Sequence, residues 1–350
     1  MTRNSHWHDI DDEDPYALPA HDPLAILKST RTVVEQGTYA WINQEQVDSL
    51  ATQWMHTMQK NTELTLQPTQ PLWDTHYHFH DGTERTVNWL LLLDALNFCF
   101  WAEKDQPRWT IEYQGETLNG YWAEAAALKR AVAEDIPLWD ASYLSTISAE
   151  TIAYIFRGNQ TIPLFEQRVE NAREVGRVLL ERYDGRFTRA IEQAHNSAIA
   201  LATELIQHFP SFRDTAPYHE REVRFFKRAQ ICVADLAAAF HGTPWGNFED
   251  LDQLTIYADY KLPQVLRHYN VLEYHTSLAK RIDAQILLDH GSAEEVEIRS
   301  CTIWACELLR RALQLHGYTL PVTDIDRHLW FLGQNISDMQ PYHRTRTIYY

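Results

Sequence analysis

The sequence has few cysteines, and none of them stands at a metal-binding or redox spacing. Its 350 residues contain four, which are Cys99, Cys232, Cys301 and Cys306, and no CxxC pair. All four lie in apolar stretches, where buried free thiols are common. A disulfide framework is therefore not expected, and the pattern predicts a protein of a reducing compartment, the cytoplasm.

Long apolar runs are also missing. The longest, VNWLLLLDALNFCFW from Val87 to Trp101, contains polar residues and falls short of the roughly 20 apolar residues that a membrane-spanning helix needs. The amino-terminal MTRNSHWHDIDDEDP has no apolar segment of the kind found in signal peptides. We therefore expect no membrane partner.

Positive charge is scarce. The chain has 31 basic and 48 acidic residues, which gives a net charge of -17. Duplex nucleic acids and anionic membranes attract basic surfaces, so neither is expected as the main partner. A small anionic molecule is still compatible with this charge if basic side chains gather locally.

Several catalytic motifs are absent. The sequence contains no G-x-x-x-x-G-K-[ST], no G-x-G-x-x-G, no G-x-S-x-G and no H-E-x-x-H. These motifs provide phosphate loops, dinucleotide sites, activated serines and zinc ligands. Nucleoside triphosphate hydrolysis, nicotinamide redox chemistry and serine hydrolysis therefore have no support.

What the sequence does contain is helical periodicity. Residues 1–22 are polar and acidic and predict a flexible tail, and residues 23–350 contain no Pro/Gly/Ser-rich linker and predict one domain. Residues 61–86 predict loops with short strands, and Arg108–Trp122 predicts a hairpin that turns near Gly115. The expected fold is mostly α, with one large helical domain and a small β element.

Two residues mark the ends of the last long predicted helix. Ser292, followed three residues later by Glu295, forms an S-x-x-E capping box, and Gly317 is placed to end the helix. Aromatic residues are abundant, with 12 tryptophans and 17 tyrosines. They are compatible with a pocket for a flat ligand and equally with a large ordinary core.

Lys227 occupies an unusual position in Arg221–Phe240, which reads as one helix. In that helix Lys227 falls on the apolar arc between Val223 and Ile231. Arg221, Arg224, Arg228 and Asp235 share its flank. A lysine on an apolar face is costly to bury unless it meets a carboxylate or an anionic ligand. The alternative is that its stem packs while its ammonium reaches solvent.

Asp259 stands in LTIYADYKLPQVLRHY, among aromatic residues and before a helix start marked by Pro263. One interpretation is a helix cap, in which the carboxylate satisfies free backbone N–H groups. The other is an active-site group. Glycosyl-transferring sites use carboxylates because positive charge develops on the sugar ring in the transition state.

Three histidines alternate in HYHFH, and on a strand His76, His78 and His80 would share one face. Three imidazoles on one face can bind zinc or iron. A metal-dependent hydrolase is therefore the alternative function, although no fourth ligand at a known spacing is near. A run of this kind also occurs on ordinary exposed strands.

Two further groups of polar residues interrupt apolar sequence. Asp94, Asn97 and Trp101 share a face of the predicted helix LLLDALNFCFW, where they could bind a base-like ligand or tie the core to a loop. The carboxyl-terminal YHRTRTIYY is aromatic and basic, so we expect it to dock on the fold. Arg344 and Arg346 would then be available to an anion.

Several stretches together resemble one family. They are LLLDALNFCFW, GYWAEAAALKRAVAEDIP, FPSFRD, FFKRAQICVAD, YADYKLPQVL, EEVEIRSCTIWACELL and HRTRTIYY. In this order, from about residue 70 to the carboxyl terminus, they resemble the queuosine salvage proteins, the queuosine 5′-phosphate N-glycosylase/hydrolases. The first 60 residues contribute little to the resemblance, and HYHFHDG departs from it locally.

The resemblance implies a helical fold related to helix-hairpin-helix DNA glycosylases. It implies hydrolysis of queuosine 5′-phosphate to queuine and ribose 5-phosphate, with no metal or other cofactor. Asp259 would be the carboxylate at the sugar and Lys227 a second essential polar group. Substrate-binding positions would be His78, Asp94, Asn97, Trp101, Phe226, Asp235, Tyr260 and Arg344. Of these, Tyr260 and Phe226 would line the base pocket.

The leaving base makes this reaction demanding. Queuine is a 7-deazapurine, so it has no N7 to protonate, and Asp259 would have to stabilise the oxocarbenium ion more strongly or orient the attacking water. Lys227, with Arg224 or Arg344, is the candidate phosphate ligand. The remaining alternative is a non-enzymatic helical scaffold whose aromatic residues are interface anchors.

Overall fold

The computed structural model describes residues 14–60 and 73–350, and this part of the chain is mostly helical. Its α-helices are α1 (Ile26–Gln36), α2 (Gln44–Lys60), α3 (Glu84–Leu96), α4 (Gly120–Ala133), α5 (Ala141–Ser145), α6 (Ala149–Ile155), α7 (Phe165–Arg182), α8 (Thr188–Gln193), α9 (Ala198–His208), α10 (Lys227–Ala239), α11 (Lys261–His268), α12 (Thr276–Asp283), α13 (Ala293–Leu315) and α14 (Val322–Asn335). Two 3-10 turns accompany them, η1 (Pro210–Phe212) and η2 (Leu251–Gln253).

The strands form three small antiparallel sheets of two strands each. The pairs are β1 (Ala40–Ile42) with β6 (Leu272–Tyr274), β2 (Thr110–Tyr113) with β3 (Glu116–Asn119), and β4 (Thr215–Tyr218) with β5 (Arg221–Arg224). The β2–β3 pair confirms the predicted hairpin. Its two turn residues, Gln114 and Gly115, both have positive φ, as a two-residue type I′ turn requires.

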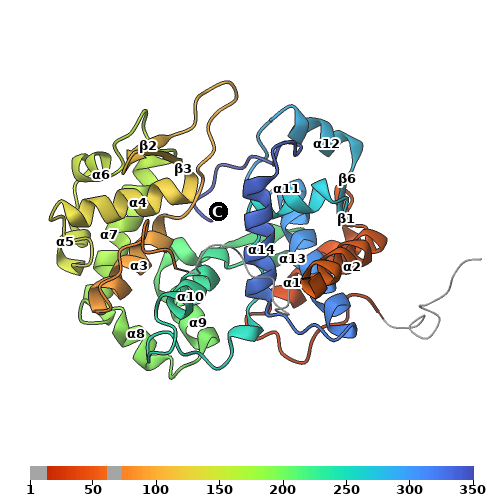
Figure 1. The fold of residues 1–350 in the computed structure, drawn as a ribbon, viewed down its shortest axis with the longest axis horizontal. Helices are drawn as coiled ribbons and strands as arrows, with labels where there is room; N and C mark the ends of the chain where they lie inside the picture. The colour runs from red at the N-terminus through yellow and green to blue at the C-terminus, as the bar shows by residue number, and fades with distance from the viewer. Residues whose placement is uncertain (1–13, 61–72) are drawn as a thin grey trace, which may run out of the picture.

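The two ends of the chain pack together. Helices α1 and α2 lie against α13, whose residues are buried along most of its length. In Figure 1, α3 to α10 lie on one side of the molecule, and α11 to α14 lie on the other side with α1 and α2. The carboxyl terminus lies between the two sides. The chain therefore returns to its amino-terminal helices after building the opposite half.

The long helix predicted over Arg221–Phe240 is wrong. Arg221 and Arg224 belong to strand β5, and Phe226 turns the chain in the left-handed region at φ 48°. Helix α10 then begins at Lys227. Lys227 is therefore the first residue of a helix and does not sit midway along an apolar face. The sequence signal failed because the hairpin is short and no glycine marks the left-handed turn.

Two buried arginines stop α3 and hold the segment that follows it. Arg168 from α7 donates hydrogen bonds to the carbonyl oxygens of Leu96 and Phe98. Arg228 from α10 donates to the carbonyls of Asp94 and Ala95. The last carbonyls of a helix have no partner within it and carry partial negative charge, so guanidinium groups are favourable there. These contacts direct the chain after Leu96 toward the middle of the molecule.

Helices α11 and α14 approach closely at a glycine. A Cβ on Gly333 would lie 2.8 Å from Val265 Cγ2 and 3.1 Å from Lys261 Cε. Real Cβ atoms rarely come this close, so any larger residue would push α14 away from the start of α11. Gly333 thereby fixes the position of α14 relative to Lys261.

The expected docking of the carboxyl-terminal segment is confirmed. Tyr350 is 1% exposed, accepts a backbone hydrogen bond from Cys99, and donates its hydroxyl to Glu295 at 2.7 Å. At the other end, Tyr16 packs edge-on against Trp304, so the ordered chain begins before residue 23. Residues 1–13 of the predicted tail lie outside the described residues.

The predicted helix ends around α13 are confirmed. The Ser292 side chain accepts a hydrogen bond from the backbone of Glu295, and Gly317 follows the helix at φ 84°. In a capping box the Glu295 side chain would accept the backbone N–H of Ser292. Here it accepts the backbone N–H of Gly291 instead. Among the described residues, no helix is long and apolar enough to cross a membrane.

Candidate active site

A cavity of about 410 Å³ opens between the two sides of the molecule. Its wall is formed by the segment after α3, the start of α4, one face of α10, the segment from Tyr257 to Leu262, and α14. Of the predicted site residues, those in the wall are His78, Asn97, Trp101, Lys227, Asp235, Asp259 and Tyr260. Those not in the wall are Asp94, Phe226 and Arg344.

Asp259 is both a helix cap and a cavity residue. Its Oδ1 accepts hydrogen bonds from the backbone N–H groups of Lys261 at 2.7 Å and Leu262 at 2.9 Å, at the start of α11. The same carboxylate lines the cavity. The two interpretations of the sequence are therefore compatible. The helix N-terminus holds the group and favours its negative charge.

Lys227 is the buried cation of the site. It is 5% exposed and lines the cavity, and its ammonium makes no hydrogen bond to a described residue. Burial lowers the pKa of this ammonium, and the charge of Asp259 acts in the opposite direction. The buried lysine and the partly exposed carboxylate are therefore close enough for their charges to interact in the cavity wall.

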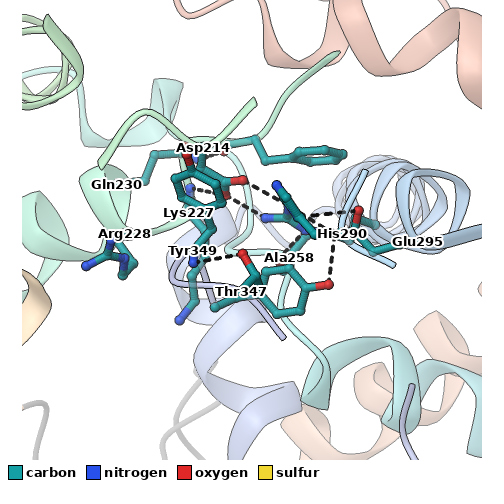
Figure 2. Close-up of polar contacts among 12 residues, drawn as sticks. Asp214, Lys227, Arg228, Gln230, Ala258, His290, Glu295, Thr347 and Tyr349 are labelled. Carbon is teal, nitrogen blue, oxygen red and sulfur yellow. Dashed lines mark hydrogen bonds and ion pairs between the residues drawn. The ribbon is translucent and has the colours of Figure 1, made fainter. Parts of the chain in front are cut away.

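One buried ion pair holds both of these residues in place. Asp214 pairs with Arg299 at 2.6 Å and also accepts the backbone N–H of Lys227. Arg299 donates its Nε–H to the carbonyl of Ala258, the residue before Asp259. Figure 2 shows Asp214 together with Lys227, Ala258 and Glu295. The pair therefore links the start of α10 to the chain that carries Asp259.

His78 is buried and fixes the orientation of Tyr121. Burial lowers the pKa of His78 to about 4, so its ring is neutral at pH 7. Its Nδ1 lies 2.8 Å from the carbonyl oxygen of Asp74 and therefore carries the proton, and its Nε2 accepts the Tyr121 hydroxyl at 2.8 Å. Because the proton of Tyr121 is committed to His78, the phenol oxygen can only accept from a ligand.

The three histidines do not share a face. Residues 76–80 form a turn and no strand, so the expected alternation is wrong. His80 contacts the carbonyl of Ala239, and His76 packs edge-on against Tyr77, away from the contacts of His78. Within residues 14–60 and 73–350, no group of three His, Cys, Asp or Glu side chains could hold a metal ion. The metal-site alternative therefore has no geometric support from this cluster.

The predicted face of Asp94, Asn97 and Trp101 is divided by the end of α3. Asn97 and Trp101 lie beyond the helix, in the chain that Arg168 holds, and both line the cavity. Asp94 lies within the helix, is fully buried, and has no hydrogen bond from a described residue on either oxygen. Asp94 therefore does not line the cavity, and its contact with substrate stays a prediction.

Aromatic rings line the cavity on opposite sides. Tyr260 packs against Tyr342 with ring centroids 4.9 Å apart, next to Trp101. Trp122 from α4 meets Trp330 from α14 at 5.9 Å. Tyr260 is placed as predicted, whereas Phe226 points into the core and contributes no wall. The rings leave a space suited to a flat, apolar-faced ligand.

The cations of the cavity also differ from those expected. Arg224 pairs with Glu222 on β5, outside the wall. The Arg344 guanidinium stacks over Trp101 at 5.6 Å, and its Nε and Nη1 are buried without a described partner. Arg346 pairs with Glu103. The cavity itself is lined by Arg108, Lys227, Lys261 and Arg327.

Comparison with known proteins assigns the family. The family model described as Queuosine salvage protein matches residues 76–350, most of the chain. This chain belongs to the queuosine salvage protein family. The predicted resemblance from about residue 70 to the carboxyl terminus is confirmed.

Three relatives of this queuosine salvage protein are named Queuosine 5′-phosphate N-glycosylase/hydrolase. The protein of Sphaerobacter thermophilus is 47% identical over 330 residues, which cover 94% of this chain and 98% of that protein. That of Mus musculus is 40% identical over 279 residues, covering 76% and 82%. That of Dictyostelium discoideum is 33% identical over 342 residues, covering 94% and 100%.

Several wall residues of this queuosine salvage protein were not predicted from its sequence. They are Arg108, Tyr121, Trp122, Tyr257, Lys261, Asp326, Arg327 and Trp330. Arg108, Tyr121 and Trp122 belong to the hairpin and the helix after it, and α14 supplies the last three. Lys261 was visible beside Asp259 as an uncommon charge in an aromatic segment. For α14 the sequence offered no signal, because only its packing against α11 brings it to the cavity.

Proposed function

We propose that this protein hydrolyses the N-glycosidic bond of queuosine 5′-phosphate and releases queuine and ribose 5-phosphate for use in tRNA modification. The observation that carries the proposal is the carboxylate of Asp259, held at a helix N-terminus in an aromatic cavity opposite Lys227. The names of the relatives supply the substrate. The reaction needs a fixed negative charge beside the sugar, and the carboxylate at the start of α11 provides one.

Asp259 stabilises the sugar as the bond to the base breaks. Positive charge develops on the ribose ring, and a fixed carboxylate near it lowers the barrier without reorganising. The two backbone N–H groups on Oδ1 hold the carboxylate and leave Oδ2 free to accept from water. The positive charge of Lys227 lies near Asp259 in the same wall.

The base occupies the aromatic part of the cavity. A flat ring stacks between side chains such as Tyr260 and Trp330, which costs no hydrogen bonds and gains contact area. The oxygen of Tyr121, oriented by His78, accepts from an N–H of the base. These contacts favour a heterocycle with a donor edge over a plain aromatic ring.

Arg108 and Lys261 are the phosphate ligands in this proposal. Both line the cavity, and they are close enough that Arg108 contributes to lowering the pKa of Lys261, after burial. Two neighbouring cations repel each other unless an anion lies between them, which a 5′-phosphate provides. Neither has a carboxylate salt-bridge partner among the described residues.

Arg108→Ala should raise the KM for queuosine 5′-phosphate about tenfold or more, because one hydrogen bond to a charged group is lost. The kcat and KM for unphosphorylated queuosine should stay unchanged where that substrate is cleaved. Steady-state kinetics on the two substrates measure the effect. Arg85→Ala, a change at an exposed arginine stacked on Trp139, is the matched control. An equal loss on both substrates would place the phosphate elsewhere.

Incubation of the purified protein with queuosine 5′-phosphate tests the function itself. We expect free queuine and ribose 5-phosphate in equal amounts, detected by liquid chromatography and mass spectrometry. Full activity after chelation would rule out the metal-dependent alternative. A rise in melting temperature with added queuine is expected, because a ligand stabilises the state that binds it. No release and no rise would favour the scaffold alternative.

Two finer statements complete the proposal. We place the fold with the helix-hairpin-helix DNA glycosylases, which is supported by the mostly helical architecture and by an acidic residue at a helix start in the cleft. We place the protein in the cytoplasm, which is supported by its four buried free cysteines. The net charge of -17 supports a small nucleotide over duplex nucleic acid as the partner.

A further inference from the structure

Four carboxyl groups surround a single lysine at the base of the cavity. Lys227 has charge interactions with Asp94, Asp235, Asp259 and Asp326. Asp94 and Asp326 are buried, whereas Asp235 and Asp259 are partly exposed and line the cavity. Arg228 also acts on Asp94, and Arg327 on Asp326, so three cations act on the four carboxyl groups. Negative charges still outnumber positive ones, and burial favours a proton on the groups that have the fewest donors.

Hydrogen bonds separate these carboxyl groups into two kinds. Asp259 accepts two backbone N–H groups, and Asp326 accepts the backbone N–H of Tyr257 at 2.7 Å. Asp235 accepts no hydrogen bond from a described residue, and only the weak thiol donor of Cys232 approaches Asp94. Donors stabilise the charged form of a carboxyl group, and Asp94 and Asp235 receive the least of this stabilisation.

The surroundings of Asp235 favour its neutral form. The groups that face it are Asp94 from α3, Tyr121 from α4, Lys227 and Cys232 from α10, and Tyr257 from the segment before α11. Burial raises the pKa of Asp235 to about 7, against the influence of Lys227, and raises that of Asp94 well above its usual range. Burial therefore favours the protonated form of both carboxyl groups.

We propose that Asp235, protonated in the free enzyme, donates its proton to the departing base. The inference rests on the proposed function and identifies the acid that this reaction needs. A deazapurine is a poor leaving group without a proton, and it has no N7 to receive one. Asp235 lines the cavity and is close enough for its charge to act on Tyr121, whose oxygen accepts from the base in the proposed binding mode.

The proton balance closes over one turnover. The bond between C1′ and the ring nitrogen breaks, and its electron pair goes to the base. The proton of Asp235 goes to the base, which leaves as neutral queuine. Water adds to C1′ and gives its proton to the Asp259 carboxylate. Asp259 then releases this proton to solvent, and Asp235 takes one up, so both groups return to their starting states.

Asp326 is the competing candidate, because it also lines the cavity and burial raises its pKa to about 8. Its Oδ2 is occupied by the N–H of Tyr257, and it lies beside Asp259, which adds to the rise of its pKa. We therefore place Asp326 at the sugar, together with Asp259. Asp235 accepts no such hydrogen bond from a described residue, so its protonated carboxyl group is available to a ligand.

Asp235→Asn tests the proposal with two substrates. Asparagine keeps the size and neutrality of the protonated acid but cannot release a proton. We expect kcat on queuosine 5′-phosphate to fall about a hundredfold or more, as is typical when a general acid is lost. A 4-nitrophenyl β-riboside 5′-phosphate has a leaving group that needs no proton, so its cleavage should stay within a few-fold of the wild type.

The pH dependence gives a second, independent readout. For the wild type, kcat/KM on queuosine 5′-phosphate should fall as the pH rises through about 7, because the acid loses its proton. Asp235→Asn should lack this decline, and the nitrophenyl substrate should lack it with either enzyme. If the nitrophenyl substrate is not accepted, this profile alone decides the question. Asp252→Asn, the same change at an exposed residue on η2, is the control and should behave as the wild type.

The outcomes that overturn the proposal are distinct. Wild-type activity of Asp235→Asn on queuosine 5′-phosphate, or an equal loss on both substrates, would deny Asp235 the role of acid. A loss that depends on the leaving group in Asp326→Asn, with none in Asp235→Asn, would transfer the role to Asp326. No queuine release by the wild-type enzyme would overturn the proposed function itself, and this inference with it.

Discussion

Asp259→Asn is expected to lower kcat for queuosine 5′-phosphate by roughly a thousandfold, the scale of losing one preorganised charge-stabilising group. The asparagine oxygen can still accept the N–H groups of Lys261 and Leu262, so the start of α11 should be preserved. Only the negative charge beside the sugar is removed. Initial rates of queuine release measure the change, and thermal unfolding shows whether the variant is folded.

Asp140→Asn is the matched control for this prediction. Asp140 also caps a helix with one oxygen, accepting from the second and third residues after it, but it is exposed and lies outside the cavity wall. It should keep wild-type activity. If Asp259→Asn also released queuine at the wild-type rate, Asp259 would be a helix cap alone and another group would stabilise the sugar.

Asp214→Asn should lower the free energy of unfolding by about 3 kcal/mol, because a buried guanidinium loses the closer of its two carboxylates. Arg299 is completely buried, and its guanidinium forms two hydrogen bonds to Asp214. An asparagine presents one N–H group to these donors and cannot satisfy both. Urea denaturation at pH 7 measures the effect. Catalysis should also weaken at temperatures where the variant is folded, because Lys227 loses the acceptor of its backbone N–H.

Glu222→Gln removes one partner of an ion pair with Arg224 that is exposed to solvent, and it should change stability by less than about 1 kcal/mol. Comparing the stability of Glu222→Gln with that of Asp214→Asn separates the effect of burial from the effect of a salt bridge as such. Unfolding of Asp214→Asn within the same margin would mean that Arg299 finds another partner. Glu295, 3.5 Å from the same guanidinium, is the available group.

The predictions for Asp259 and Asp214 both depend on the buried ion pair between Asp214 and Arg299. Asp214 and Arg299 bind the residue at the start of α10 and the carbonyl that precedes Asp259. The two charged groups of the site come from segments 32 residues apart in sequence, and this pair connects them directly. Its role in stability and its role in placing the site therefore cannot be separated by a single substitution at Asp214.

The sequence by itself determined the helical class, the hairpin at Gly115, the ends of α13 and the family. These features depend on neighbours along the chain. An N–H group at a helix start needs a cap within three residues, and a tight turn needs residues that tolerate positive φ. Asp259 was found in the same way, because a carboxylate among aromatic residues before Pro263 is a local anomaly.

The tertiary structure decided which side chains meet. The left-handed turn at Phe226 moved Lys227 to a helix start, and the end of α3 separated Asp94 from Asn97 and Trp101. α14 reached the cavity only through its packing on α11. The proton that we propose on Asp235 depends on the tertiary structure in the same way. Whether a carboxyl group is ionised depends on burial and on charges from several helices, and no single stretch of sequence contains them.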